Sequence, residues 1–367
     1  MFTGIVLSDF HLAASKLEPK HQYDTLKEFF YPHLRDKDVC IISGDFFDTS
    51  LLFDHEASII ATTIMTDISI LCKNNNIPLR ILRGTFSHDR DQLKQFATIA
   101  SHYSVDYKYF DVISVDKIKD KTFIYFPDTL PYKSISDAVN NGYQLLKETY
   151  NAEVPNIVIG HGYFKHRIPN EKLLDVIPHY SIDMFRDCEL VLFGHEHIHW
   201  NKNNVYSVGS FDRLNHGEEA PKGFMTFSID RSTDTTFIEN KLAIKHITIE
   251  AKGESVDEKI SNLCKEIENK FLNKVGYLRI RDNTDDRLTL VSLLKDKYPE
   301  LNITSESNLV KSHDKKLSLD FTIYHYDVPT IETIDHDLLD FVKSNFDASI
   351  SEKLFNKYIK EIKDATI

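Results

Sequence analysis

From the start of the chain to about residue 244, short apolar runs alternate with stretches whose apolar positions recur at helical spacing. Short apolar runs bounded by Gly, Pro or Asp are typical of buried strands, whereas i, i+3, i+4 spacing is typical of amphipathic helices. The pattern predicts strands over 3–9, 38–45, 78–84, 122–128, 155–162, 188–197, 204–210 and 223–230, and helices over 23–34, 57–75 and 134–150. It therefore indicates a layered α/β domain, with mixed β-sheets flanked by helices, over residues 1–244.

The pattern changes after residue 244 and predicts two further parts. Residues 245–330 alternate two strand-like runs with two helical patterns, which indicates a small α+β domain that ends in a link of unassigned structure. Residues 331–367 show apolar residues at helical spacing on both sides of "NFDASIS", which predicts a helix-loop-helix. Such an apolar stripe either packs on the chain's own domain or binds a partner.

The composition narrows the class of protein. Hydrophobic residues make up 41% and charged residues 27%, as in ordinary soluble domains, and no run approaches the roughly 18 apolar residues of a membrane helix. The N-terminal "MFTGIVLSDFH" lacks the features of a signal peptide, and the four cysteines are scattered without a CxxC pair. We expect a protein without membrane association, in a reducing cytoplasm.

The charge balance restricts how the chain can hold a nucleic acid. Its formal net charge is −12 at pH 7. A protein that binds a polyanion by electrostatics alone is usually basic. A nucleic-acid substrate would therefore require bound cations, a local basic patch or a partner protein.

Acidic residues and histidines follow five of the predicted strands at their carboxyl ends. They are Asp9, His11, Asp45, Asp48, His88, Asp89, His161, His195 and His197. In open α/β sheets, ligands bind outside the carboxyl ends of the strands. Five such strand ends in one chain predict that these side chains converge on a single site.

Imidazole and carboxylate side chains without thiolates favour Mn²⁺, Fe²⁺ or Zn²⁺ as the bound ion. The six strongest candidates exceed the needs of one tetrahedral ion and suit two ions about 3.5–4 Å apart that share a carboxylate; they are Asp9, His11, Asp45, His161, His195 and His197. Asp45 is the natural bridge. His88 is predicted to be catalytic, protonating the leaving oxygen or stabilising transition-state charge, with Asp89 fixing its orientation or tautomer.

The motifs D-x-H, GDxxD, a Gly-led loop ending in HD, GHG and GHxH follow one another over about 230 residues. In this order they resemble those of the calcineurin-like metallophosphoesterases. The segment "VYSVGSFDRLNHGEEAPKGFMTF" (205–227) resembles the one that follows GHxH in the Mre11/SbcD branch of DNA nucleases.

This resemblance implies a Mn²⁺-dependent double-strand DNA exonuclease and endonuclease subunit, acting in DNA repair, recombination or replication. Residues 245–330 would be its capping domain, and 331–367 would dock on the coiled coil of a Rad50/SbcC-like ATPase. The resemblance also implies a homodimer, in the cytoplasm of a bacterial cell or a phage-infected host.

The resemblance further implies a ligand set for each of two metal ions. One ion would be held by Asp9, His11, Asp45 and His197, and the other by Asp45, His161 and His195, with His88 as the catalytic histidine. One loop departs from the family pattern GNHD, in which the Asn ligates the second metal: this chain has "GTFSHD" (84–89), two residues longer and without Asn. Whether Ser87 or Thr85 takes the place of that Asn stays open.

Several alternatives stay open from the sequence. His166 and Arg167 either contact a phosphate or belong to a solvated loop, and Asp48 either positions a ligand or caps a helix. His199 is expected on the surface. The chain as a whole could instead be a small-molecule phosphodiesterase or phosphatase of the same fold, or a scaffold subunit with weakened catalysis.

Overall fold

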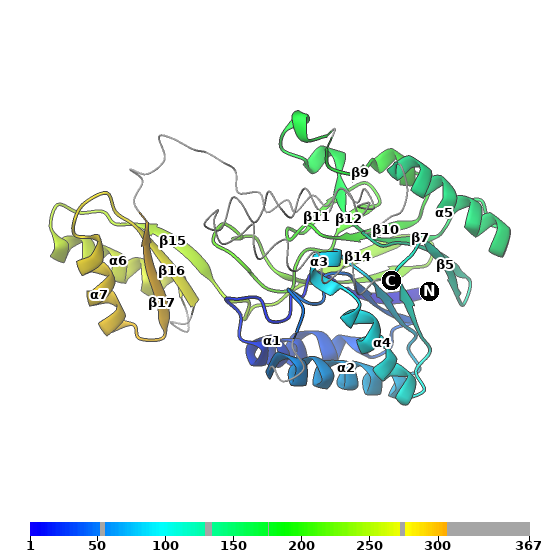
Figure 1. The fold of residues 1–367 in the computed structure, drawn as a ribbon, viewed down its shortest axis with the longest axis horizontal. Helices are drawn as coiled ribbons and strands as arrows, with labels where there is room; N and C mark the ends of the chain where they lie inside the picture. Colours follow the sequence, from blue (N-terminus) through cyan, green and yellow to red (C-terminus); the bar gives the residue numbers. More distant parts are fainter. Residues whose placement is uncertain (52–55, 129–133, 175, 272–275, 307–367) are drawn as a thin grey trace, which may run out of the picture. The chain divides into compact units, whose positions relative to one another are not determined.

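The computed structural model describes residues 1–51, 56–128, 134–174, 176–271 and 276–306. Two mixed six-stranded sheets and a smaller α+β unit make up most of this part of the chain (Figure 1). The predicted α/β fold with mixed sheets flanked by helices is confirmed. Within the described residues, no helix combines the length and the apolar character needed to cross a bilayer.

The first sheet places two of the site-bearing strands at its centre. Its strands β1 to β4 run parallel, whereas β13 is antiparallel to β1 and β14 is antiparallel to β13. In spatial order the strands are β14 (Thr233–Glu239), β13 (Gly223–Ile229), β1 (Phe2–Leu7), β2 (Val39–Ser43), β3 (Leu79–Leu82) and β4 (Tyr107–Phe110).

The second sheet carries the other two site-bearing strands. Its four inner strands are parallel, and the two edge strands are antiparallel to their neighbours. In spatial order they are β11 (Trp200–Lys202), β12 (Val205–Ser207), β10 (Leu190–Gly194), β7 (Ile157–His161), β6 (Lys121–Phe126) and β5 (Ser114–Ile118). A short pair, β8 (Tyr163–Phe164) with β9 (His179–Tyr180), follows β7.

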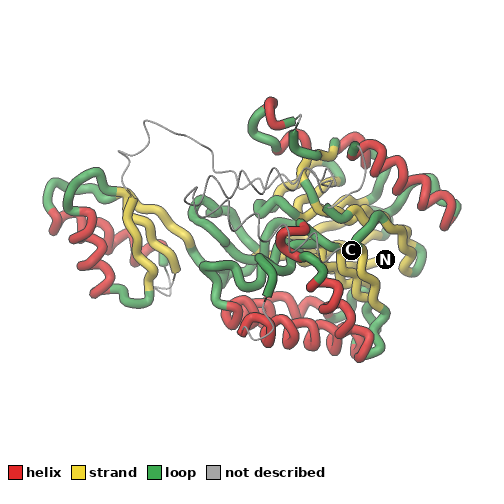
Figure 2. Tube along the Cα trace, in the orientation of Figure 1, coloured by secondary structure: helices red, strands yellow, loops and turns green. Residues whose placement is uncertain are grey.

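Helices cover the outer faces of the two sheets (Figures 1 and 2). The first sheet is flanked by α1 (Pro19–Thr25), which continues as π-helical η1 (Leu26–Phe30) and 3-10 η2 (Tyr31–Leu34), and by α2 (Glu56–Asn74) and α4 (Gln92–His102). The second sheet is covered by α5 (Ile135–Tyr150), whose first turn is capped by the Ser134 hydroxyl accepting from the Asp137 N–H. One turn of helix, α3 (Phe86–Asp89), follows β3.

The two sheets and the helices on their outer faces form four layers, and three apolar cores lie between these layers. One lies between the first sheet and its helices and includes Ile64 and Leu93, and another lies between the second sheet and α5 and includes Leu146. The third lies between the two sheets, where Val6 of β1 and Ile159 of β7 belong to the same buried cluster. Since strands buried on both faces need apolar side chains at every position, this packing explains the unbroken apolar runs of the sequence.

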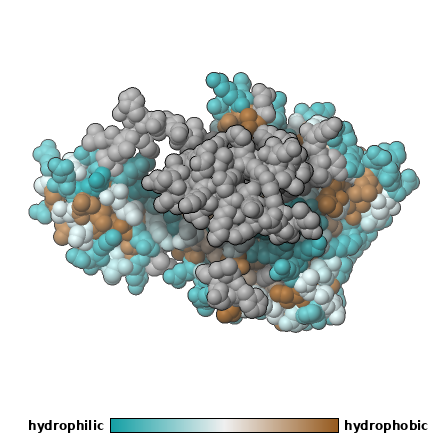
Figure 3. Space-filling view, in the orientation of Figure 1, coloured by the Kyte–Doolittle hydropathy of each residue, from teal (hydrophilic) through white to brown (hydrophobic). Residues whose placement is uncertain are grey.

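The smaller unit has a core of its own. It is a parallel three-stranded sheet with two helices: β15 (His246–Glu250), β16 (Gly276–Arg281), β17 (Leu301–Glu306), α6 (Val256–Lys270) and α7 (Arg287–Lys297). The coloured part of the face in Figure 3 is mostly hydrophilic with separate hydrophobic patches. Leu288 and Leu293 of α7 are exposed apolar residues of the smaller unit. The predicted C-terminal helices over 331–367 lie outside the described residues, and the boundaries of the three domains stay predictions.

The sequence pattern missed several elements that the structure contains. Helix α4 buries only Leu93, Ala97 and Ala100 among its well-defined side chains, and such small residues give a weak helical signal. Strand β14 is an edge strand with half-exposed, mostly polar residues, so its sequence lacks a clear apolar run. Strand β17 lay within the predicted small domain but was not assigned as a strand.

Candidate metal centre

The predicted ligands lie where the carboxyl ends of β1, β2, β7 and β10 meet. His161 is the last residue of β7, and the remaining five follow within four residues of their strands. The glycines before them allow this close approach: a Cβ on Gly194 would come within 2.0 Å of Ser8 Oγ, and one on Gly44 within 2.4 Å of His161 Nδ1. The chain therefore brings the ends of both sheets into direct contact at this place.

Four of the six predicted ligands have a strained backbone. The φ angles are 48° at Asp9, His11 and Asp45, and 89° at His195. Non-glycine residues rarely adopt positive φ, and those that do often cluster at functional sites. The fold thus holds these side chains at a local energetic cost, and we infer that their placement has a function.

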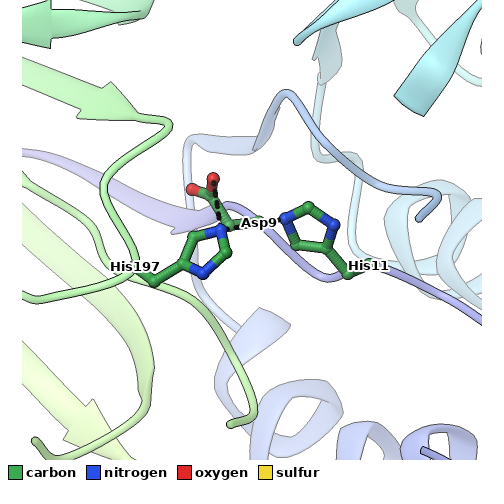
Figure 4. A group of neighbouring side chains, drawn as sticks. All are labelled: Asp9, His11 and His197. Carbon is green, nitrogen blue, oxygen red and sulfur yellow. Dashed lines mark hydrogen bonds and ion pairs between the residues drawn. The ribbon is translucent and has the colours of Figure 1, made fainter. Parts of the chain in front are cut away.

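Asp9, His11 and His197 form the first group, in which the candidate ligand atoms lie within 4.8 Å of one another (Figure 4). The Nε2 atoms of the two imidazoles are 3.1 Å apart, and His197 Nε2 is 4.0 Å from Asp9 Oδ1. The Asp9 carboxylate is fixed by the backbone N–H of His195, which donates to both its oxygens at 2.9 and 3.0 Å.

The orientation of the two imidazoles in the first group shows what the site is built to hold. Asp48 Oδ1 lies 3.2 Å from His11 Nδ1, and Glu218 Oε1 lies 3.4 Å from His197 Nδ1. A carboxylate only accepts, so each Nδ1 donates to it and each Nε2 is left facing the other. When deprotonated, these two nitrogens, 3.1 Å apart, both offer lone pairs to the same cation. The donor set therefore fits a divalent metal ion.

Asp45, His161 and His195 form the second group, again with candidate ligand atoms within 4.8 Å of one another. The His161 ring is fully buried, its Nδ1–H donates to the Ser43 carbonyl at 2.9 Å, and its Nε2 lies 3.1 Å from Asp45 Oδ2 without hydrogen-bond geometry. Burial lowers the pKa of His161, but the Asp45 carboxylate raises it more strongly, to about 10. In the metal-free chain, a proton on His161 Nε2 therefore balances the negative charge of Asp45, which a bound metal ion would otherwise balance.

Asp45 connects the two groups. Its Oδ2 atom lies 3.1 Å from His161 Nε2 in the second group and 3.9 Å from His11 Nε2 in the first. Burial raises the pKa of Asp45, yet the neighbouring His161 and His11 lower it well below its ordinary range, so the carboxylate is ionised. One carboxylate between two ligand groups is the arrangement that a pair of metal ions requires.

Comparison with known proteins identifies the family. The family model described as calcineurin-like phosphoesterase matches residues 3–199, more than half of the chain. The chain belongs to the calcineurin-like phosphoesterases.

Similarity beyond the family model is distant. A solved structure of the protein TT1561 of Thermus thermophilus is 12% identical with a TM-score of 0.39, and covers 64% of this chain and 98% of its own. Another solved structure is 11% identical with a TM-score of 0.38, over 65% of this chain and 99% of its own. No curated protein matches the chain significantly.

Calcineurin-like phosphoesterases are metal-dependent hydrolases of phosphoesters that use a pair of divalent ions, and the two groups of this chain suit such a pair. The identity of the ions and the role of each residue stay predictions. The six predicted side chains lie in two neighbouring groups, and Asp45 belongs to the second group and not to the first, 3.9 Å from His11 Nε2.

The longer loop of this calcineurin-like phosphoesterase places Thr85 at the second group. The Thr85 backbone N–H donates to Asp45 Oδ1 at 2.6 Å, and its hydroxyl donates to Asp45 Oδ2 at 3.2 Å. The same hydroxyl is 3.4 Å from His195 Nδ1. No hydrogen bond links Ser87 to a predicted ligand in the described part of the chain, so the geometry favours Thr85 at the position left by the missing Asn.

His88 lies beside the first group, but the predicted partnership with Asp89 is wrong. The His88 ring meets the His11 ring edge-on with centroids 4.8 Å apart, and its Nδ1 donates to the Asp48 carbonyl. Asp89 is fully buried and accepts from four backbone N–H groups at 2.8–3.2 Å, those of Gly84, Asp45, Phe46 and Phe47. Asp89 therefore links the loops that follow β2 and β3 by hydrogen bonds. The residue that orients His88 is Asp48, through its backbone carbonyl.

Asp48 contacts His11 through its side chain, which is one of the two roles that the sequence left open, and its carboxylate lies within 4.8 Å of ring nitrogens of His11 and His88. Two further residues that support the site were not predicted as site residues. Glu218 contacts His197, and the buried Lys222 donates to Glu218 Oε2 at 2.6 Å and to the His197 carbonyl at 2.7 Å.

Both Glu218 and Lys222 belong to the segment that resembles the nuclease branch, which was the available signal. His199, expected on the surface, is half-buried against Phe237 and donates to the Ser207 carbonyl.

Proposed function

We propose that this phosphoesterase is the Mn²⁺-dependent DNA nuclease subunit of a complex with a Rad50/SbcC-like ATPase. The observation that carries the proposal is Asp45 lying between two groups of carboxylate and imidazole ligands at the meeting edge of two sheets. Imidazole with carboxylate, and no thiolate, is a ligand set that suits Mn²⁺.

The residues around the site hold the predicted metal ligands in the positions that phosphodiester hydrolysis requires. A bound pair of divalent ions supplies charge to the phosphate and lowers the pKa of a water molecule. Asp9 is fixed by the N–H of His195, and His11 and His197 are fixed by Asp48 and Glu218, so the ligands are preorganised.

His88 stands in position for proton transfer. Its Nδ1–H donates to the Asp48 carbonyl, and its Nε2 makes no hydrogen bond to the described residues. In the imidazolium form, Nε2 carries a second proton that it can donate to the leaving oxygen.

Two features support DNA over a small phosphodiester as the substrate. The segment that resembles the nuclease branch is integrated into the site, because its residues Glu218 and Lys222 hold His197. The chain also has a separate α+β unit over His246–Glu306, which an enzyme for a small substrate does not need. In a chain of net charge −12, an ATPase partner would supply the remaining affinity for DNA.

The test uses the purified chain with linear double-stranded DNA and Mn²⁺, beside His88→Ala and beside bis-p-nitrophenyl phosphate as a small diester. His102→Ala is the matched control, because His102 is exposed at the end of α4. We expect degradation of DNA by the parent and by His102→Ala, and a reduction of about 10²- to 10⁴-fold in His88→Ala.

Other results would favour the rival functions. Hydrolysis of the small diester without cutting of DNA, even when a cognate ATPase is added, would indicate a small-molecule phosphodiesterase. Absence of both reactions together with absence of bound metal would indicate a scaffold subunit.

A further inference from the structure

A group of basic residues around one tryptophan lies beside the metal centre and is not used by the chemistry described so far. We call it the basic rim: Lys165, His166, Arg167, Trp200 and Lys202. It comes from two short segments, the 3-10 turn η3 (Lys165–Arg167) that follows β8, and the edge strand β11. Both segments lie close in the chain to predicted ligands: β8 begins two residues after His161, and β11 begins three residues after His197.

Glu196 ties the basic rim to the centre. Arg167 Nε donates to Glu196 Oε2 at 2.7 Å, and Trp200 Nε1 donates to the same oxygen at 3.0 Å. Glu196 stands between the predicted ligands His195 and His197 in the chain. The rim is therefore positioned by the loop that carries two of those ligands.

The side chains of the basic rim also contact one another. The Arg167 guanidinium lies 5.8 Å from the centroid of the Trp200 ring, and the His166 ring meets the Trp200 ring edge-on at 4.8 Å. Trp200 and Lys202 are two residues apart on β11, so their side chains project from the same side of the strand. Besides burial, Lys202 and Arg167 lower the pKa of His166, which indicates that these cations lie near one another.

The charges of the basic rim are largely unneutralised. Lys165 and Lys202 are exposed and form no ion pair with the described residues, and Arg167 uses only its Nε for Glu196, leaving both Nη atoms without a protein partner in that part of the chain. Elsewhere, lysines are often paired, as in Lys20 with Asp24. An arginine held by its Nε with a free Nη pair, beside unpaired lysines, is suited to bind phosphate oxygens.

We propose that the basic rim binds the phosphates that flank the scissile phosphodiester, so that the substrate of the centre is a polynucleotide strand. The inference rests on the proposed nuclease function and names its substrate class from the chain's own residues. A small diester has no flanking phosphate and cannot use the rim, whereas a DNA strand presents a charge about every 3.4 Å along the helix axis. A chain with a net charge of −12 needs a local source of positive charge to bind DNA, and the basic rim provides one.

The first experiment measures binding without cutting, in the His88→Ala background with Mn²⁺ present. A fluorescently labelled DNA duplex is titrated by anisotropy over a series of salt concentrations. The test variant is Lys165→Ala with Lys202→Ala, since both side chains are exposed and neither forms an ion pair or a side-chain hydrogen bond with the described residues. The matched control is Lys37→Ala with Lys117→Ala, two lysines that line a pocket at the opposite, amino-terminal end of the strands.

We expect the test variant to weaken DNA binding about 10-fold or more near physiological salt and to lower the salt slope by about 1–2 units, with the control unchanged. With His88 restored, the test variant should lose cutting of DNA and keep hydrolysis of bis-p-nitrophenyl phosphate. Arg167→Ala should act in the same direction, and its rate on the small diester reports whether the Glu196 loop still holds the ligands.

Equal DNA binding, salt slope and cutting by the parent and the test variant would overturn the basic rim as a phosphate site and leave the nuclease proposal intact. A parent chain that hydrolyses the small diester but neither binds nor cuts DNA would overturn both proposals. Loss of both DNA cutting and small-diester hydrolysis in the lysine variant would also contradict the rim, since it would indicate damage to the centre itself.

Discussion

The two ligand groups contain similar side chains but are held in different ways. In the first group, each imidazole has a carboxylate at its Nδ1: Asp48 for His11 and Glu218 for His197. In the second group, His161 donates to a backbone carbonyl, and among the described residues His195 Nδ1 has only the Thr85 hydroxyl at 3.4 Å. The two groups therefore offer similar ligand atoms, but they differ in the hydrogen-bond partners that hold their imidazoles in place.

This difference has a chemical consequence. A carboxylate behind a ligating histidine fixes its orientation and raises its basicity, and loss of such a partner typically weakens metal binding about 10- to 100-fold. Lys222 strengthens the effect at the first group, because it is buried and holds Glu218 in place. We therefore expect the first group to bind its ion more tightly than the second, which also lacks the family's Asn.

The largest effect is expected from the residue that the two groups share. Asp45→Asn removes the charge between His11 and His161, so both ions should be lost and hydrolysis should fall by more than the roughly 10²-fold of a supporting residue. Metal content after dialysis and hydrolysis of bis-p-nitrophenyl phosphate measure this change. Asp120→Asn, at an exposed turn, is the control. Retention of two tightly bound ions by Asp45→Asn would show that the groups do not share this carboxylate.

Glu218→Gln should affect only the first group. It keeps the size of the side chain but removes the carboxylate behind His197, so affinity for one ion should fall about 10- to 100-fold while the other is unchanged. Isothermal titration with Mn²⁺ resolves the two affinities. The neighbouring Glu219 is exposed, which makes Glu219→Gln a matched control. An equal loss at both sites would contradict separate support for the two groups.

The pH dependence should mark the second group. The pKa of His161 is about 10, because Asp45 raises it against the effect of burial, and Nε2 must lose its proton before it can bind a metal ion. Apparent affinity for the second ion should therefore rise about tenfold per pH unit below pH 10. Proton release measured on Mn²⁺ binding at pH 8 checks this, and its absence would mean that His161 is already neutral.

Deprotonation of His161 raises the affinity for the second ion but lowers the stability of the metal-free chain. A histidine whose folded pKa is raised, from 6.5 to about 10, contributes stability that is fully present below pH 6.5. That contribution is lost as the pH rises through 10. Denaturant unfolding of the metal-free chain across this range should therefore show declining stability, and His161→Gln should lack the decline.

The smallest effect is expected at the loop that lacks the Asn. Thr85→Val keeps the shape but removes the hydroxyl beside Asp45 and His195, and should weaken the second ion by no more than about 10-fold. Thr85→Asn should strengthen it, since an amide oxygen is a ligand suited to Mn²⁺. Ser87→Ala is the control, and a larger effect from it than from Thr85→Val would reverse the assignment.

The sequence was sufficient for the strands that carry the predicted ligands, because these strands and the residues after them follow a local pattern. Each ligand follows an apolar run directly, and parallel strands bring their carboxyl ends together. Asp45 was predicted as the bridge from its central strand, and the structure places it beside both groups. The confirmed fold class rests on the same alternation of apolar runs and helical patterns.

The supporting residues could not be predicted in the same way, because their contacts depend on loop conformation. Asp89 stands next to His88 in the sequence, yet the single turn α3 directs its carboxylate to the backbone N–H groups of the neighbouring loop. Glu218 reaches His197 across 21 residues with no periodic signal. The choice between Ser87 and Thr85 stayed open in the sequence, and the hydrogen bonds of the loop favour Thr85.

The most direct test of the shared centre is electron paramagnetic resonance of the chain loaded with two equivalents of Mn²⁺. If Asp45 lies between two ions about 3.5–4 Å apart, the spectrum should show exchange coupling between the two manganese ions, and Asp45→Asn should abolish it. Two independent six-line signals in the parent chain, or saturation at one ion, would contradict the account.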